Sequence, residues 1–405
     1  MLRHTSFFRR PATILIALLA FSSLLWCILM VLSPHGVESR VFYEQGRHWL
    51  GDFTCVRNCA AEGYANALQP LYDSCYPAFG VLVAGLFPRE AALSFTVVGL
   101  LLWAVSFAVF LKRVGRMPLG LKAVFFGAVL LSGVVLHAFE RGNQILYATA
   151  GTTLFLAWFD TTCAVKRRMA LAALAGAAVL KISPALLIVL LAVRLRDGLK
   201  DNLRSVVVDV VWFGAVGALL FFVPFAGVGG VEGFRQWLAN AAANAARYAQ
   251  CGAWGVVPIV RTLRIVRHQD VMAAWPGLRL EQLVGAFLGC GCLAAAGWQV
   301  VKGRCAAAVN GRLLLFVVAA LLLIPGNMHF YTGLYLLPVL ALRLGEDDFG
   351  WFESACWFAI LCPLQIPCGT GCLNHPIANL AFLALVGQAA ISLFTNSRKY
   401  AIINT

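Results

Sequence analysis

Long apolar runs separated by short polar connectors make up almost the whole chain. A helix needs about 20 mostly apolar residues to cross a bilayer, so each long run is a candidate membrane span. Together with two shorter helices over 169–193, these runs predict an all-α polytopic membrane protein with about twelve transmembrane or membrane-embedded helices. The predicted spans are residues 12–32, 90–111, 122–137, a run after 144 that ends near 165, 205–225, 282–301, 313–325, 332–344, 351–366 and 376–394.

Lysines and arginines gather in alternate connectors, and this pattern predicts how the chain is threaded through the membrane. The basic connectors at 112–122, 166–168 and 302–304 are expected in the cytoplasm, because cytoplasmic loops carry an excess of Lys and Arg. We therefore predict one integral-membrane domain, residues 1–405, with both termini cytoplasmic. Residues 33–89 then form a first extracytoplasmic loop with interfacial helices, and residues 226–281 form a second extracytoplasmic segment.

Residues 169–193 allow two interpretations. As one span, they would place the basic cluster at 166–168 and the basic stretch at 194–204 on opposite sides of the membrane, against the positive-inside pattern. As two short helices that meet at Lys181, they would leave both clusters in the cytoplasm. Pro184 favours this second arrangement, since a proline disfavours the helical conformation in the residue before it. We predict the hairpin.

The N-terminus resembles a secretory signal peptide, with Arg3, Arg9 and Arg10 ahead of an apolar stretch. That stretch is longer than a usual signal core, and no obvious small-residue cleavage site follows it. We therefore predict a first span that is retained in the protein.

Composition supports a membrane protein and explains the charge. Hydrophobic residues make up 61% of the chain and charged residues 12%, whereas soluble domains average about half apolar and a quarter charged. The formal net charge of +14 follows from the basic cytoplasmic connectors. No basic stripe with interleaved aromatic residues, as single-stranded nucleic acids favour, stands out in the sequence. A nucleic-acid partner is therefore not expected.

The first sizeable polar stretch, residues 38–76, follows closely after the first span. It holds several carboxylates, arginines, aromatic residues and three cysteines, which makes it the leading candidate for an active site. Glu38 lies shortly beyond the span, near the depth of lipid headgroups, where its alternative role is an interfacial salt bridge with Arg40. The other candidate carboxylates are Glu44, Asp52 and Asp73.

Five short motifs follow one another along the chain. They are Glu38 to Tyr43 (ESRVFY), Tyr76-Pro77, Arg141-Gly142-Asn143, Lys181 to Pro184 (KISP), and Pro325 followed by His329, Phe330 and Tyr331. In this order they resemble the GT-C superfamily of integral-membrane glycosyltransferases, specifically glycosyltransferase family 87, the polyprenyl-phosphate-mannose-dependent mannosyltransferase-like group. Two positions depart from the family pattern: Glu38 stands where the family usually has Asp, and Ala78 where it usually has a second Pro.

The resemblance implies a GT-C-like fold and an inverting transfer of a mannose-like hexose from a polyprenyl-phosphate donor to a lipid or glycan acceptor. A carboxylate must take the proton of the acceptor hydroxyl, and other groups must stabilise charge on the departing phosphate. Glu38 is the implied general base, and no cofactor or metal is expected. The implied substrate-binding residues are Arg40, Tyr43, Tyr76, Arg141, Asn143, Lys181, His329 and Tyr331.

The same resemblance implies a location and a set of partners. We expect a bacterial plasma (inner) membrane protein whose active site faces the extracytoplasmic side. Its partners are then the lipid-linked sugar donor, the acceptor and the surrounding membrane lipids.

Several of these residues also have an ordinary structural role. Arg141 and Lys181 suit helix-end anchors in the headgroup region, Asn143 and Gln144 suit backbone contacts at a turn, and Tyr331 suits an interfacial aromatic belt. For the whole chain, the alternative function is a multi-pass transporter or lipid-linked-sugar flippase, which would hold ionisable groups near the bilayer midplane. Lys181 would lie at that depth if residues 169–193 formed one span.

The thirteen cysteines divide between the predicted spans and the outer segments. Those within or near spans suit small packing residues. An oxidising compartment permits disulfides among the outer ones, with the pairing undetermined by sequence. Cys55 with Cys59, or Cys368 with Cys372, could begin a zinc site, but neither pair has well-placed histidine partners in the sequence. The outer cysteines are Cys55, Cys59, Cys75, Cys251, Cys368 and Cys372.

Overall fold

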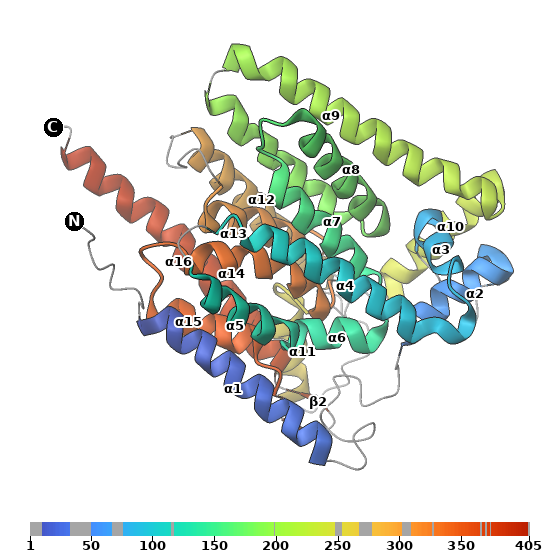
Figure 1. Ribbon diagram of the computed structural model, residues 1–405, viewed down its shortest axis with the longest axis horizontal. Helices are drawn as coiled ribbons and strands as arrows, with labels where there is room; N and C mark the ends of the chain where they lie inside the picture. The colour runs from blue at the N-terminus through green and yellow to red at the C-terminus, as the bar shows by residue number, and fades with distance from the viewer. Residues whose placement is uncertain are drawn as a thin grey trace.

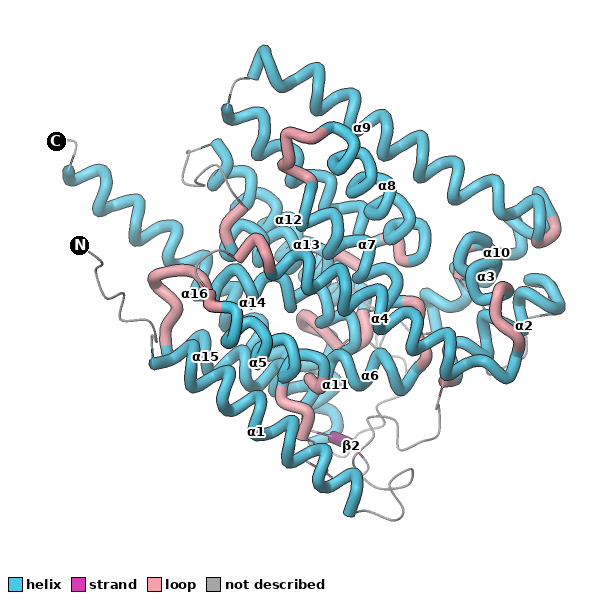
Figure 2. Tube along the Cα trace, viewed as in Figure 1, coloured by secondary structure: helices cyan, strands magenta, loops and turns pink. Residues whose placement is uncertain are grey.

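A computed structural model shows a helical protein, with a two-residue β-ladder (β1, Pro367–Cys368; β2, Gly371–Cys372) in the described part of the chain. Figure 1 shows the helices packed into one bundle, and Figure 2 shows how little loop lies between them. The structure describes residues 10–32, 50–66, 76–114, 117–197, 199–247, 253–266, 278–301, 309–325, 328–364, 367–368, 371–372 and 374–403.

Five described helices are long and apolar enough to cross a membrane. A sixth span results if α5 (Leu119–Leu130) and α6 (Gly133–Arg141) count as one helix bent by 46°. The expectation of an integral membrane protein with several spans is therefore confirmed. The five long helices are α1 (Arg10–Leu32), α4 (Ala92–Leu111), α9 (Leu199–Phe222), α12 (Leu278–Val301) and α16 (Asn374–Ile403).

The remaining predicted spans are shorter helices, and burial explains how short helices suffice there. Almost every residue of α13 is buried, because α12, α14, η2, η4 and α16 pack around it. Such a helix faces protein and needs no full bilayer thickness of its own. The short apolar helices are α7 (Ile145–Trp158), η2 (Ser183–Asp197), α13 (Gly311–Leu323), η4 (Phe330–Leu336) with α14 (Leu337–Leu344), and α15 (Trp351–Leu361).

Helices α1 and α9 lie at opposite edges of the bundle (Figure 1). The apolar surface of α9 is mostly uncovered, with Val211, Leu219 and Phe222 among its exposed side chains. An exposed apolar surface of this size is typical of a face that meets lipid. The hydrophobic core lies between these edge helices, around α13 and α14.

Residues 169–193 form the predicted hairpin. Helix α8 (Ala164–Leu180) ends at Lys181, and η2 runs back towards the start of α8. The return is secured by Asp209 of α9, whose Oδ2 accepts from Arg167 Nε at 2.7 Å and from Arg194 Nη1. Both basic clusters therefore lie at the same end of the bundle, whereas Lys181 lies at the other end.

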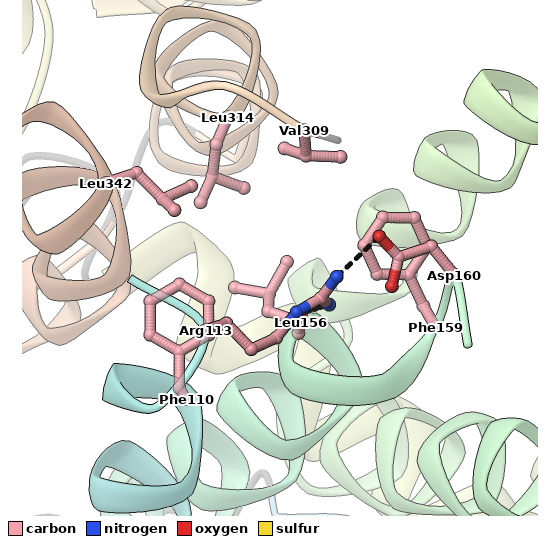
Figure 3. Close-up of a pocket in the computed structure, with 8 residues that line it drawn as sticks. All are labelled: Phe110, Arg113, Leu156, Phe159, Asp160, Val309, Leu314 and Leu342. Atoms are coloured by element: carbon pink, nitrogen blue, oxygen red, sulfur yellow. Dashed lines mark hydrogen bonds and ion pairs between the residues drawn. The ribbon is translucent and has the colours of Figure 1, made fainter. Parts of the chain in front are cut away.

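Arg113 places another basic connector at that same end. Its guanidinium donates to the carbonyl oxygens of Leu156 and Ala157, at the end of α7, and forms an ion pair with Asp160 at 2.6 Å. The pair lines a small, largely apolar cavity, and Figure 3 shows the two charged groups in contact with each other at one side of it, opposite Leu314 and Leu342. We call this the basic end of the bundle, and the opposite end the site end.

Short helices cover the site end. Helices α2 and α3 lie in the first predicted outer segment, residues 33–89, and α10 and α11 lie in the second, residues 226–281. Helices α2 and α10 are joined by the Asn240 amide, which donates to the Tyr64 carbonyl at 3.3 Å, and by rings of an aromatic cluster that includes Phe225 and Trp237. Phe53 of α2 also meets Phe95, near the start of α4, with ring centroids 4.8 Å apart. These elements are α2 (Gly51–Asn66), α3 (Ala78–Gly85), η1 (Arg89–Ala91), η3 (Val223–Gly227), α10 (Gly230–Arg247) and α11 (Val257–Val266).

Candidate functional site

A tight turn between α6 and α7 presents two of the predicted site residues. Helix α6 ends at Arg141, and Gly142 follows in the left-handed conformation, with φ 61° and ψ 36°. A Cβ atom at Gly142 would lie 3.2 Å from the Leu50 Cα atom and from Thr96 Oγ1. Both the backbone angles and the space therefore call for glycine here. The turn places Arg141 and Asn143 next to the start of α2.

Asp52, in the first turn of α2, binds both of these residues. Its Oδ1 accepts from Arg141 Nη2 at 2.6 Å, and its Oδ2 accepts from Arg141 Nε at 3.2 Å. This two-point contact is the geometry in which a guanidinium binds a carboxylate most strongly. The Asn143 amide also donates to Oδ2, and it donates to Tyr76 Oη at 3.2 Å. Asp52 is thus the centre of the polar contacts.

The surroundings keep Asp52 ionised. Burial alone would raise the pKa of this carboxyl, which is 9% exposed. The charge of Arg141, the hydrogen bonds from Arg141 and Asn143, and the charge of Lys181 outweigh burial, so the Asp52 pKa lies below its ordinary value of 3.8. A carboxylate with a low pKa and both oxygens engaged is a weak proton acceptor.

Lys181 approaches the same place from the turn between α8 and η2. Its Nζ lies 4.6 Å from the centre of the Tyr76 ring and 6.0 Å from that of Tyr331. An ammonium group is attracted to the face of an aromatic ring at such distances. The Tyr76 ring is itself held from α2, because the Tyr64 hydroxyl donates to the Tyr76 carbonyl at 2.7 Å.

Aromatic and histidine rings from other helices close the site. The His329 and Tyr331 rings stack with centroids 5.3 Å apart, and the ring of His137, in the middle of α6, lies 5.5 Å from that of Tyr331. His375, at the start of α16, lies 5.7 Å from His137. The Trp254 indole donates to the His329 carbonyl at 3.1 Å, which fixes the start of η4.

His329 is held neutral at ordinary pH. Burial lowers its pKa from 6.5 to about 4, and the nearby charges of Arg141 and Lys181 act in the same direction, whereas Asp52 opposes them. A neutral imidazole both donates and accepts a hydrogen bond, so this side chain suits a hydroxyl or a phosphate oxygen as partner.

A pH prediction follows for His329. Its folded pKa of about 4 lies below the unfolded value of 6.5, so the unfolded chain binds more protons between these two values and stability falls as the pH falls through this window. Between pH 7 and pH 4, the free energy of unfolding should therefore fall by about 1–3 kcal/mol less in the His329→Gln variant than in wild type. Unfolding of the detergent-solubilised protein followed across this range measures the difference. Equal pH dependence in the two proteins would contradict the prediction.

The structure brings six predicted substrate-binding residues together from four separate parts of the chain. Glu38, Arg40 and Tyr43 lie outside the described residues, as do Glu44 and Asp73. The six residues are Tyr76, Arg141, Asn143, Lys181, His329 and Tyr331.

Three residues at the site are additions to the predicted set. Asp52 was one of several candidate carboxylates, and only its contacts distinguish it. His137 and His375 drew no prediction; their one signal was that each stands where a predicted span meets an outer connector. Gln144, in contrast, has the structural role that its position suggested, since its amide donates to the Gly80 carbonyl at 2.6 Å and ties α7 to α3.

The cysteines and possible metal ligands contribute little to the site. Cys59 is buried in the apolar cluster beneath α2, among Phe53 and Val56. Cys75 and Cys251 lie outside the described residues. Within the described part of the chain, no three His, Cys, Asp or Glu side chains gather closely enough to hold a metal ion.

Because the comparisons with known proteins found no match, the chemistry of the site is the guide to function. No family model matches the chain, no curated protein matches it, and no solved structure matches it. The site combines a bound carboxylate, two cations, a neutral imidazole and aromatic rings at one end of a membrane bundle, a set of groups suited to an anionic, hydroxyl-rich ligand.

Proposed function

We propose that the chain is an inverting membrane glycosyltransferase of the GT-C type. It moves a mannose-like hexose from a polyprenyl-phosphate donor to a lipid or glycan acceptor. The observation that supports this most directly is the meeting of six residues, expected at a substrate site from their order along the chain, around Asp52. Chance placement of helix-end anchors gives no reason for residues so far apart in sequence to converge.

The reaction needs groups that this end of the bundle supplies. The acceptor hydroxyl attacks the anomeric carbon, its proton passes to Glu38, and the bond from that carbon to the phosphate oxygen breaks. Negative charge grows on the departing phosphate, which cations placed beforehand stabilise. Arg141 and Lys181 supply the positive charge, and His329 and Asn143 supply hydrogen bonds to the phosphate or the sugar.

The position of the site fits a lipid-linked donor. The three arginines that pair with Asp160 and Asp209 lie at the basic end, so the site end corresponds to the extracytoplasmic face under the positive-inside pattern. Both termini are then cytoplasmic, in a GT-C-like bundle of about twelve membrane segments in a bacterial plasma membrane. The donor's phosphate sits at headgroup depth, beside a site that the short outer helices cover.

The transporter alternative loses its strongest residue. Lys181 would have been an intramembrane charge in a single span, but it lies at the turn of a hairpin. A carrier places its binding groups near the bilayer midplane, whereas the polar contacts described above gather at one end. The arrangement thus favours a transferase.

Reconstitution tests the proposal. Purified protein in lipid nanodiscs receives polyprenyl-phosphate mannose or glucose together with candidate glycolipid acceptors. We expect sugar transfer with inverted anomeric configuration, and loss of transfer in Asn143→Leu, which keeps a branched side chain but removes the bonds to Asp52 and Tyr76. Movement of the lipid-linked sugar across proteoliposomes with no transfer to any acceptor would establish the flippase instead.

A further inference from the structure

The backbone around His329 is held by a segment that lies 75 residues earlier in the chain. The Trp254 indole donates to the His329 carbonyl at 3.1 Å, and the Ala253 backbone N–H donates to the Met328 carbonyl at 2.6 Å. The His329 carbonyl also accepts from the Thr332 hydroxyl of η4 at 2.6 Å. Residues 253–254 therefore bind two consecutive carbonyls, and His329 stands where these bonds meet.

Helix α16 holds that segment in turn, through the side chain of Asn379. Its Oδ1 accepts from the Gly255 backbone N–H at 2.7 Å, and its Nδ2 donates to the Gly255 carbonyl at 2.9 Å. Asn379 is fully buried, and its carboxamide offers the acceptor and the donor that these two backbone groups need. Gly255 and the neighbouring Trp254 are thereby fixed to α16.

The Trp254 ring is closely packed between α16 and η4. The side chain is 1% exposed, and its ring stacks on Phe330 with centroids 5.8 Å apart and meets Phe382 edge-on at 5.4 Å. A Cβ atom at Gly333 would lie 2.8 Å from the same ring. This packing leaves the indole little freedom, so its N–H is directed at the His329 carbonyl.

The His329 imidazole is held differently. Within the described part of the chain, its nitrogens form no hydrogen bond, and its ring contact is the stack with Tyr331. The direction of the ring therefore depends on where the His329 backbone lies. A displacement of about 1 Å in a group that positions a substrate can cost about 10²-fold in rate.

We propose that Trp254 and Asn379 are positioning residues for His329. Asn379 fixes the Gly255 backbone to α16, and the Trp254 indole fixes the His329 carbonyl. Together they present the imidazole nitrogens to the phosphate or the sugar hydroxyls of the ligand. This inference rests on the proposed function, because both residues act on the reaction through His329.

Trp254→Phe tests the indole contact, since it keeps an aromatic ring and removes the N–H. It should lower kcat/KM for sugar transfer about 2- to 10-fold, the range for one lost hydrogen bond. In a protein that already carries His329→Gln, the same substitution should lower kcat/KM no further, because two residues that act through one group are not additive. Equal losses in the two backgrounds would overturn the role of Trp254.

Trp357→Phe is the matched control. Trp357 of α15 is also 1% exposed, but its indole N–H has no acceptor among the residues that the structure describes. The substitution removes the same atoms from a buried position and should leave kcat/KM unchanged. A loss equal to that of Trp254→Phe would assign the effect to packing and overturn the link to His329.

Asn379→Ala tests the contact with α16. It removes both bonds to Gly255 and leaves room for a water molecule to replace them. We expect a lower kcat/KM in the otherwise wild-type protein and no further loss in the His329→Gln background. A loss of the same size in both backgrounds would show that Asn379 does not act through His329.

NMR titration of histidine-labelled protein in detergent follows His329 without any transfer reaction. The chain has seven histidines, and the spectrum of His329→Gln identifies the signal of His329. Burial lowers the His329 pKa to about 4. A ring released from its position gains contact with water, so this pKa should rise towards 6.5 in Trp254→Phe and in Asn379→Ala. It should stay at the wild-type value in Trp357→Phe.

The two measurements separate this inference from the proposed function. A wild-type protein that transfers no sugar overturns the proposed function, and the NMR titration still decides whether Trp254 and Asn379 hold His329. An unchanged His329 pKa together with unchanged kcat/KM in both variants overturns the positioning role. If only one variant changes, the role is overturned for the other residue alone.

Discussion

Glu38→Gln should lower kcat for sugar transfer about 10²- to 10⁴-fold, which is the usual worth of a positioned general base. The amide keeps the size of the side chain but accepts no proton at neutral pH. Binding of the donor should change little, because Arg141 and Lys181, and not Glu38, are the cations proposed to bind its phosphate. Single-turnover kinetics with the reconstituted protein measure the effect, and donor titration shows whether binding is intact.

Glu44→Gln is the matched control, since it makes the same substitution six positions along the same polar stretch. It should transfer sugar at close to the wild-type rate. If the Glu38→Gln variant still transfers sugar while the Asp52→Asn variant shows the 10²- to 10⁴-fold loss of kcat, then Asp52 is the base and Glu38 is not. The contacts of Asp52 argue against that result, because Arg141 and Asn143 occupy its oxygens and lower its pKa.

Arg343→Met should destabilise the folded protein by about 3–5 kcal/mol, the usual cost of removing one partner from a buried ion pair. Arg343 is 2% exposed and donates from Nη2 to both oxygens of Glu353 at 2.8 Å. Its Nη1 donates to Asp348 at 2.9 Å and to Glu346. Methionine fills a similar volume but leaves the Glu353 carboxylate, itself 8% exposed, without the cation.

The contacts around Arg343 explain why the effect should be global. They join the end of α14 to the start of α15, and Glu346 also accepts from the Gly311 backbone at the start of α13. Ser354 of α15 donates to the Pro11 carbonyl at 3.0 Å, which extends the cluster to α1. Four helices are thus joined at the basic end, far from the proposed site.

Arg312→Met is the control for charge and side-chain length. Arg312 pairs with Asp348, whose side chain is 50% exposed, and exposed pairs contribute about 0–1 kcal/mol. Reversible unfolding of the detergent-solubilised variants measures both free energies. Equal losses in the two variants would show that Arg343 acts only as a surface charge, contrary to its burial.

The membrane character of the chain was predictable because the bilayer acts on local sequence. A long apolar run satisfies its own backbone as a helix, so spans such as α4 and α9 follow from the pattern alone. The hairpin at Lys181 was predictable for a similar reason. Pro184 breaks the helix locally, and the basic clusters on both sides of 169–193 exclude a single crossing.

The lengths of the inner helices were not predictable in this way. An apolar run gives the same signal whether it faces lipid or other helices, and α13 is enclosed by protein. The break between α5 and α6, bent by 46°, likewise depends on what packs around it. Hydrophobicity reports that a residue avoids water, but not which neighbour replaces the water.

By itself, the sequence determined a helical membrane protein, its two polar ends and the set of residues expected at the site, since these depend on composition and on short-range order. Only the tertiary structure decided that Asp52 is the carboxylate bound by Arg141 and Asn143, across 89 and 91 residues of chain. It also decided that the His137 ring lies beside Tyr331 and that the His375 ring lies beside His137. Contacts between distant segments arise from how the helices pack, and no local pattern records which polar groups that packing brings together.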